Sequence, residues 1–187
     1  MPHLLPVFLK FYIMQLFIHL IGRYSLLGVV LSGLLGGAAL IAAPDTKPAL
    51  ALPAPTWQLF DLAGQAVSSD QFKGKVVVVD FWATWCPPCV AEIPGYIALQ
   101  KKYAAQGLVI IGVSLDRKGP SAVREFAIAR GMNYTIVMGD DASVEAFGGI
   151  DAIPTTFLIN RRGVIVHKKI GALSSEEYEK LVQQALQ

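Results

Sequence analysis

The most distinct hydrophobic pattern in the chain is an unbroken β-branched run, Val76–Val79, which ends at an acid, Asp80. Four consecutive valines without a polar break predict a strand that is buried on both faces, as is usual in a parallel central sheet. From Cys89 onward the apolar spacing becomes that of a helix, with Ile93 and Ile97 along one side. The chain therefore passes from a buried strand into a helix across the sequence FWATWCPPC.

The segments around this strand predict further helices and strands. Gly107 ends the first helix, which we expect to be broken or kinked at Pro94, and residues 108–115 form a second buried strand. The two strands and their helix make a βαβ unit, which requires a right-handed crossover. Ser174 and Glu177 have the spacing of a capping box for the last helix. We expect the other elements at 57–61 (an edge strand), 121–130 (helix), 134–138 (strand), 142–147 (helix), 155–160 and 164–170 (an antiparallel hairpin) and 175–185 (helix).

The N-terminal region predicts a membrane anchor rather than part of the fold. Residues 24–43 are twenty consecutive uncharged positions, enough helix to cross a hydrocarbon core of about 30 Å. Lys10 and Arg23 precede this span and orient the N-terminus inward, so that the rest of the chain is exported. The alternative is a cleaved signal peptide with a site at Ala49-Leu50-Ala51, which would release a secreted soluble form; its apolar region usually spans only about 7–15 residues.

Composition sets the domain organisation and excludes some functions. We divide the 187 residues into an N-terminal segment (1–43), a linker with four prolines (44–55) and one domain (56–187). Because two of the 16 basic residues precede residue 44 and all 14 acids follow it, the remainder has no net formal charge. The absence of a basic patch argues against a nucleic-acid partner. The chain has two cysteines, both in one motif, so no disulfide framework stabilises the domain.

The two cysteines lie where a strand gives way to a helix. Unpaired N–H groups and the helix dipole stabilise a thiolate there, and lower its pKa from about 8.5 toward neutrality. Cys86, at or just before the N-cap, is the better-placed and more exposed thiol, and Cys89 lies within the first turn and is more enclosed. Pro87 and Pro88 suit the first helical positions and remove possible N–H donors to the Cys86 sulfur.

The motif FWATWCPPC, followed by Glu92 and by the downstream sequence Ile153-Pro154-Thr155-Thr156, resembles the thioredoxin-like superfamily. Within it, the chain is similar from Trp57 to the C-terminus to membrane-anchored thiol-disulfide oxidoreductases of the TlpA/ResA/CcmG type. The resemblance implies a three-layer α/β/α fold with a central mixed sheet, in which residues 121–138 are a helix–strand insertion. It also implies a cofactor-free reductant of extracytoplasmic protein disulfides, with apocytochrome c as one client and a membrane protein as electron donor.

The resemblance assigns roles to the residues of the motif. Cys86 exchanges with the substrate disulfide and Cys89 resolves the mixed disulfide. Asp80 matches the buried acid that relays a proton for the second cysteine, although it could be an ordinary acid at a strand end. Glu92 matches a glutamate that affects cysteine ionisation, and a solvated helix carboxylate is the alternative. Trp85 is expected to form a wall of the substrate groove.

The second motif is expected to face the first. The resemblance implies that Ile153-Pro154 is a cis peptide bond opposite the CxxC loop, and that its neighbours, Thr155 included, leave backbone groups for an extended substrate. An ordinary loop proline is the alternative.

Three other functions can be weighed against the redox reading. A structural zinc site needs two further ligands, and outside the N-terminal segment His167 is the only histidine. A peroxidase of the peroxiredoxin type has a T-x-x-C motif, whereas Thr84 is only two residues from Cys86. A copper chaperone of the Sco type needs a CxxxC pair and a third ligand. We therefore predict no metal site.

Overall fold

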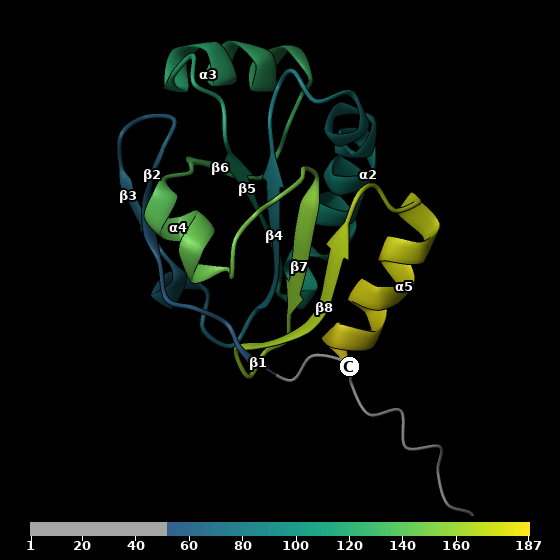
Figure 1. Ribbon diagram of the computed structural model, residues 1–187. Coiled ribbons are helices and arrows are strands. Elements are labelled where there is room, and N and C mark those ends of the chain that lie inside the picture. Colours follow the sequence, from purple (N-terminus) through teal and green to yellow (C-terminus); the bar gives the residue numbers. More distant parts are fainter. Residues whose placement is uncertain (1–51) are drawn as a thin grey trace, which may run out of the picture. The chain divides into compact units, whose positions relative to one another are not determined.

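The structure, a computed structural model, describes residues 52–187 (Figure 1). Within them, eight strands form a mixed sheet in the order β1-β8-β7-β4-β5-β6-β2-β3. The strands are β1 (Leu52–Pro53), β2 (Gln58–Asp61), β3 (Ala66–Ser68), β4 (Val76–Trp82), β5 (Leu108–Ser114), β6 (Thr135–Met138), β7 (Thr155–Ile159) and β8 (Val164–Ile170). The helices are α2 (Pro87–Tyr103), α3 (Pro120–Ala129), α4 (Asp141–Ala146) and α5 (Ser175–Leu186), with 3-10 turns η1 (Ser69–Phe72) and η2 (Ala104–Gln106).

Strand β4 is the centre of the sheet, and all seven of its residues are buried. It pairs in parallel with β5 and antiparallel with β7, so the predicted βαβ unit β4–α2–β5 is present. Helix α3 and strand β6, which follow this unit, are also present as predicted, and β6 extends the sheet in parallel beyond β5. The result is the mixed α/β thioredoxin-like arrangement expected from the sequence.

Helices cover both faces of the sheet. The side chains of β4 alternate, so Val77, Val79 and Phe81 enter the core that contains Phe147, beside α4. The opposite face carries Val76 and Val78, which pack in a core with residues of α2 and α5. Trp82, on that same face, packs in a third cluster with residues of α2 and α3. By the same alternation Asp80 lies on the face covered by α2, which places an acid beneath the helix that carries the cysteines.

Three predicted features differ in the structure. Residues 57–61 do not form an edge strand, because β2 pairs with both β3 and β6. The end of the predicted linker belongs to the sheet: Leu52 pairs with Ile165, and the Ala54 N–H donates to the Gly163 carbonyl. Finally, of the break or kink predicted at Pro94, the break is absent, because α2 continues through Pro94 to its end at Tyr103. The missing N–H of a proline costs one hydrogen bond, whereas both halves of this helix contribute buried side chains to the cores.

The predicted membrane span, residues 24–43, lies outside the described residues. Between residues 52 and 187, none of the helices is both long and apolar enough to cross a bilayer.

Candidate active site

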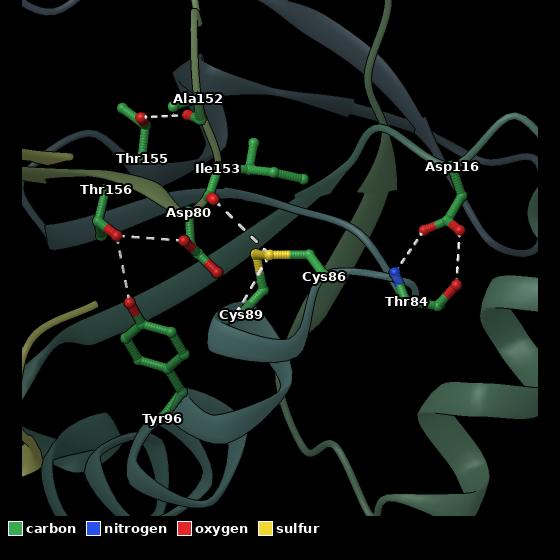
Figure 2. The surroundings of a disulfide bond; sticks show 10 residues. All are labelled: Asp80, Thr84, Cys86, Cys89, Tyr96, Asp116, Ala152, Ile153, Thr155 and Thr156. Carbon is green, nitrogen blue, oxygen red and sulfur yellow. Dashed lines mark hydrogen bonds between the residues drawn. A yellow bond between two sulfur atoms is a disulfide. The ribbon is translucent and has the colours of Figure 1, made fainter. Parts of the chain in front are cut away.

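The two cysteines form a disulfide at the junction of β4 and α2 (Figure 2). Cys86 is the N-cap of α2, and Pro87 and Pro88 occupy the first two helical positions as predicted. The Cys86 Sγ accepts a hydrogen bond of 3.3 Å from the Cys89 N–H. The prolines therefore remove two donors, and the third N–H of the helix remains and points at the sulfur that would carry the negative charge after reduction.

The burial of the cysteines corrects one expectation. Cys89 is 1% exposed and is the more enclosed residue, as predicted, but Cys86 is only 4% exposed rather than open to solvent. Both cysteines pack in the cluster that contains Trp82 and Ala83 at the end of β4, and Ile153 lies against the same cluster. The sequence places a residue at a helix end, but it does not show that the loop before Pro154 folds over it.

Exposed side chains surround the disulfide. Trp85 is 64% exposed, and both prolines of the CxxC motif are also exposed. Two cavities of about 340 and 590 Å³ lie elsewhere in the described domain, and neither is lined by a cysteine. An exposed aromatic side chain beside the disulfide, outside these two cavities, suits a segment of another protein better than an enclosed small molecule.

The predicted cis bond is present between Ile153 and Pro154. The carbonyl oxygen of Ile153 lies 3.7 Å from the Cys86 Sγ, so this loop faces the CxxC motif across the start of α2 (Figure 2). Thr155 begins β7, is 2% exposed, and donates from Oγ1 to the Ala152 carbonyl at 2.7 Å. Its side chain thus fixes the loop from inside, and contact with a substrate would fall to the loop backbone.

Asp80 lies beneath the disulfide and is 4% exposed. The antiparallel register of β4 and β7 pairs it with Thr156, whose Oγ1 donates to Asp80 Oδ1 at 3.1 Å. Burial above all, with the nearby Glu92 carboxyl, raises the pKa of Asp80 from 3.8 to about 8, against the opposite effect of the Thr156 hydrogen bond. A carboxyl with such a pKa can both take up and release a proton near neutral pH.

Glu92 is half-buried rather than a freely solvated helix carboxylate. Its Oε1 accepts a 2.9 Å hydrogen bond from the Leu173 N–H, which ties α2 to the loop before α5. Burial raises the pKa of Glu92, while the bond from Leu173 and the charge of Lys169 act in the opposite direction. The charges of Glu92 and Asp80 therefore interact. Asp80 lies on the sheet face that α2 covers, and α2 carries Glu92.

Comparison with known proteins places this site in a family. The Redoxin family model matches residues 43–185. The chain is 31% identical over 137 residues to the thiol-disulfide oxidoreductase ResA of Bacillus thuringiensis strain Al Hakam, covering 73% of this chain and 79% of that protein. It is 36% identical over 122 residues to ResA of Bacillus subtilis strain 168, covering 65% and 67% respectively. The chain belongs to the Redoxin family, as a TlpA/ResA/CcmG-type thiol-disulfide oxidoreductase.

The solved structures agree with this assignment. A thiol:disulfide interchange protein of the thioredoxin family from Chlorobium tepidum TLS superimposes with a TM-score of 0.68 at 32% identity, over 73% of this chain and 97% of that chain. The Redoxin fold therefore accounts for almost the whole described domain, and the CxxC pair and cis proline lie in it as the sequence predicted. The roles assigned to the individual side chains remain predictions.

Sequence reasoning did not identify the groups that hold this oxidoreductase's CxxC loop. Asp116, 7% exposed, follows β5 and accepts hydrogen bonds from the Thr84 N–H at 2.8 Å and the Thr84 Oγ1 at 2.6 Å. Ser114 Oγ donates to the same carboxylate at 3.0 Å. These bonds fix the residue two positions before Cys86. The sequence could have indicated this contact. Because β4 and β5 are parallel, Thr84 and Asp116, which follow their carboxyl ends, lie at the same edge of the sheet.

His167 gives no support to a metal site. It lies on β8, opposite Leu158 of β7, and burial lowers its pKa. Across residues 52–187, His, Cys, Asp and Glu nowhere form a group of three that could hold a metal ion.

Proposed function

We propose that this Redoxin-family protein reduces disulfides in other proteins outside the cytoplasm, held at the membrane by its N-terminal segment. The observation that carries this proposal is the Cys86–Cys89 pair at the start of α2, with the Ile153 carbonyl 3.7 Å from the Cys86 Sγ and a buried acid beneath it. The pair gives two-electron exchange, the loop gives a place for an extended substrate, and the acid gives a proton acceptor.

The first step is an attack by the reduced protein. The Cys86 thiolate, stabilised by the Cys89 N–H, attacks one sulfur of the substrate disulfide, and the other substrate sulfur leaves as a thiolate. The substrate segment would lie along residues 152–154 and against the exposed Trp85. Because Cys86 is only 4% exposed, a substrate would have to approach its sulfur closely along this surface.

The second step releases the product. Cys89 must lose its proton before it can attack Cys86, and we assign this proton to Asp80, whose pKa of about 8 is close to that of a thiol. The Cys89 thiolate then attacks the Cys86 sulfur, the second substrate sulfur leaves, and the disulfide seen in the structure forms. The substrate has gained two electrons, and a membrane donor must return two electrons to the pair before the next cycle.

Similarity to membrane-anchored members of the group supports the proposed location and the direction of electron flow, and apocytochrome c is the client that we propose on the same ground. Full-length protein in its own cells should fractionate with membranes. A native soluble form that begins near Leu52 would instead show that the signal-peptide alternative is right.

A trapping experiment tests the proposed exchange. Cys89→Ser removes the resolving thiolate and leaves the attacking one, so mixed disulfides that normally decay should persist. In its own cell and without reductant, this variant should give discrete higher-mass adducts that dithiothreitol removes. Cys86→Ser and the double variant are the matched controls and should give none. Mass spectrometry of the adducts names the clients.

Two outcomes would contradict parts of the proposal. Adducts that form only with Cys86→Ser would reverse the attacking and resolving roles. If neither single variant traps a protein while wild type still reduces disulfides, the two-step exchange is wrong.

A further inference from the structure

A chain of hydroxyl groups connects the buried acid Asp80 to the far side of α2. The Thr156 Oγ1 donates to Asp80 Oδ1, and its oxygen lies 3.2 Å from the hydroxyl of Tyr96 (Figure 2). Because a threonine hydroxyl has one proton, Tyr96 must be the donor to Thr156 whenever Thr156 donates to an ionised Asp80. When Asp80 is protonated the order can reverse, and Tyr96 then needs an acceptor of its own.

Tyr96 also lines a small cavity between α2 and α5. The cavity has a volume of about 10 Å³ and is lined by Glu92, Tyr96 and Tyr178, with Ser175 at its exposed side. Gly95 also lines it, and α2 and α5 approach each other closely there, since a Cβ atom at this position would lie 2.5 Å from the Ser175 Oγ.

Two of the residues that line this cavity each have a buried polar atom with no partner within the described domain. These atoms are the Oε2 of Glu92 and the hydroxyl of Tyr178, a residue that is 3% exposed. Leaving such a group unpaired in the interior costs about 1–3 kcal/mol. A buried water needs about 10–15 Å³ and two to four polar partners. The cavity meets both requirements.

We propose that this cavity binds one water molecule, and that Thr156, Tyr96 and the water carry a proton between Asp80 and Glu92 behind the disulfide. The inference rests on the proposed function, in which Asp80 receives the proton of Cys89. Asp80 passes its proton to Thr156, Thr156 passes one to Tyr96, Tyr96 to the water, and the water to Glu92. Glu92 then releases a proton to solvent past Ser175.

Such a route would let Asp80 lose its proton while a substrate is bound. In the mixed disulfide the bound substrate would cover the surface above Cys86, a residue that is only 4% exposed in the free protein. Asp80 is also buried and must return to its ionised form before the next cycle. The path through α2 leaves on the side of α5, and so stays open while the substrate is bound.

The titratable and charged groups around this path come from four elements and one loop. They are Asp80 on β4, Glu92 and Tyr96 on α2, Tyr134 before β6, Lys169 on β8 and Tyr178 on α5. Burial raises the pKa of all three tyrosines, so they stay protonated and act as donors and relays rather than as acids. The two carboxyls are thus the groups between which a proton moves.

The first test is structural and needs no variant. A high-resolution crystal structure of the full chain should show a water within hydrogen-bond distance of both the Glu92 Oε2 and the Tyr178 hydroxyl. In Tyr178→Phe, which removes one partner, its density should weaken or vanish. Well-defined density for the side chains with no water between them would overturn the water site.

The second test measures the resolving step in the full chain. A mixed disulfide is formed between Cys86 and a cysteine-containing peptide, and release of the peptide is followed from pH 6 to 9. Tyr96→Phe keeps the ring and removes the relay, so release should slow by about tenfold or more, below the 10²–10⁴-fold of a directly acting base. The loss should be greatest below pH 8, where Asp80 is protonated, and the solvent deuterium isotope effect should change.

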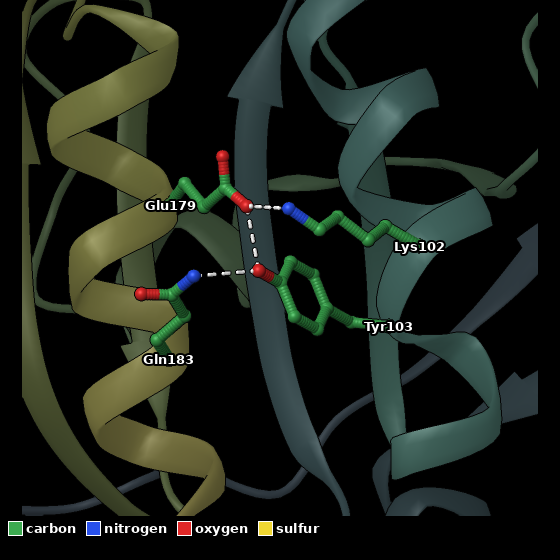
Figure 3. Close-up of polar contacts among 4 residues, drawn as sticks. All are labelled: Lys102, Tyr103, Glu179 and Gln183. Carbon is green, nitrogen blue, oxygen red and sulfur yellow. Dashed lines mark hydrogen bonds and ion pairs between the residues drawn. The ribbon is translucent and has the colours of Figure 1, made fainter.

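Tyr103→Phe is the matched control (Figure 3). Tyr103 lies on the same helix and also faces α5, but its hydroxyl donates to Glu179 and accepts from Gln183, away from the cavity. Its loss should lower stability without changing the pH profile of release.

The outcomes distinguish the proton relay through Tyr96 from the proposed role of Asp80. If Tyr96→Phe releases peptide like Tyr103→Phe at every pH while Asp80→Asn is slow, the relay is wrong and the role of Asp80 stands. If Asp80→Asn releases peptide at the wild-type rate, the proposed role of Asp80 fails, and the relay with it.

Discussion

Replacing Asp80 by Asn should stabilise the domain at neutral pH although it alters the proposed active site. Folding raises the pKa of Asp80 from 3.8 to about 8 because the carboxyl enters the interior. Above pH 3.8 the unfolded chain releases the proton and the folded chain keeps it, so this group favours unfolding more strongly as the pH rises. The side chain of Asn has nearly the same shape and carries no charge to bury.

The expected magnitude follows from the same pKa values. At pH 7 the unfolded carboxyl is about three pH units above its pKa and the folded one is still protonated, which corresponds to about 4 kcal/mol at about 1.4 kcal/mol per unit. The penalty should be absent below pH 4, grow with pH and level off above pH 8. Thr156 can donate to the Asn oxygen as it does to Asp80, so that hydrogen bond is kept.

Urea unfolding of residues 44–187 with the disulfide intact provides the assay. Free energies of unfolding for wild type and Asp80→Asn are compared from pH 3.5 to 9, and the difference reports the titration of Asp80 together with its coupling to Glu92. The curves should meet near pH 4, which serves as the internal control, and separate toward pH 8 with Asn the more stable. A difference that stays constant over this range would refute the argument.

Two further predictions concern the support of the site. Asp116→Asn should destabilise the domain by about 1–3 kcal/mol and slow alkylation of the reduced pair, because the carboxylate that accepts from both Thr84 groups is lost; an unchanged alkylation rate would remove its positioning role. Gln100→Ala should cost about 1–3 kcal/mol in urea unfolding, because this side chain bonds the Leu108 carbonyl and the Ile110 N–H of β5; equal midpoints would contradict it.

The sequence by itself determined the centre of the fold and its reactive pair. The valine run of β4 is buried along its whole length, and Cys86 and Cys89 lie at the start of α2 as the change from strand to helix spacing predicts. The capping box of Ser174 and Glu177 is also present. These features depend on neighbouring residues, so burial, helix dipole and capping act over a few positions of the chain and can be read from it directly.

Only the tertiary structure decided which distant groups meet. The contact of Thr156 with Asp80 joins residues 76 positions apart, and that of Leu173 with Glu92 joins residues 81 apart. Such contacts depend on the register of β4 against β7 and on where α5 packs on α2, which a local pattern does not specify. The burial of Cys86 has the same origin, because the loop that covers it comes from the other end of the domain. The position of the cysteine pair therefore depends on neighbouring residues, whereas the surroundings of the acids Asp80 and Glu92 depend on tertiary packing.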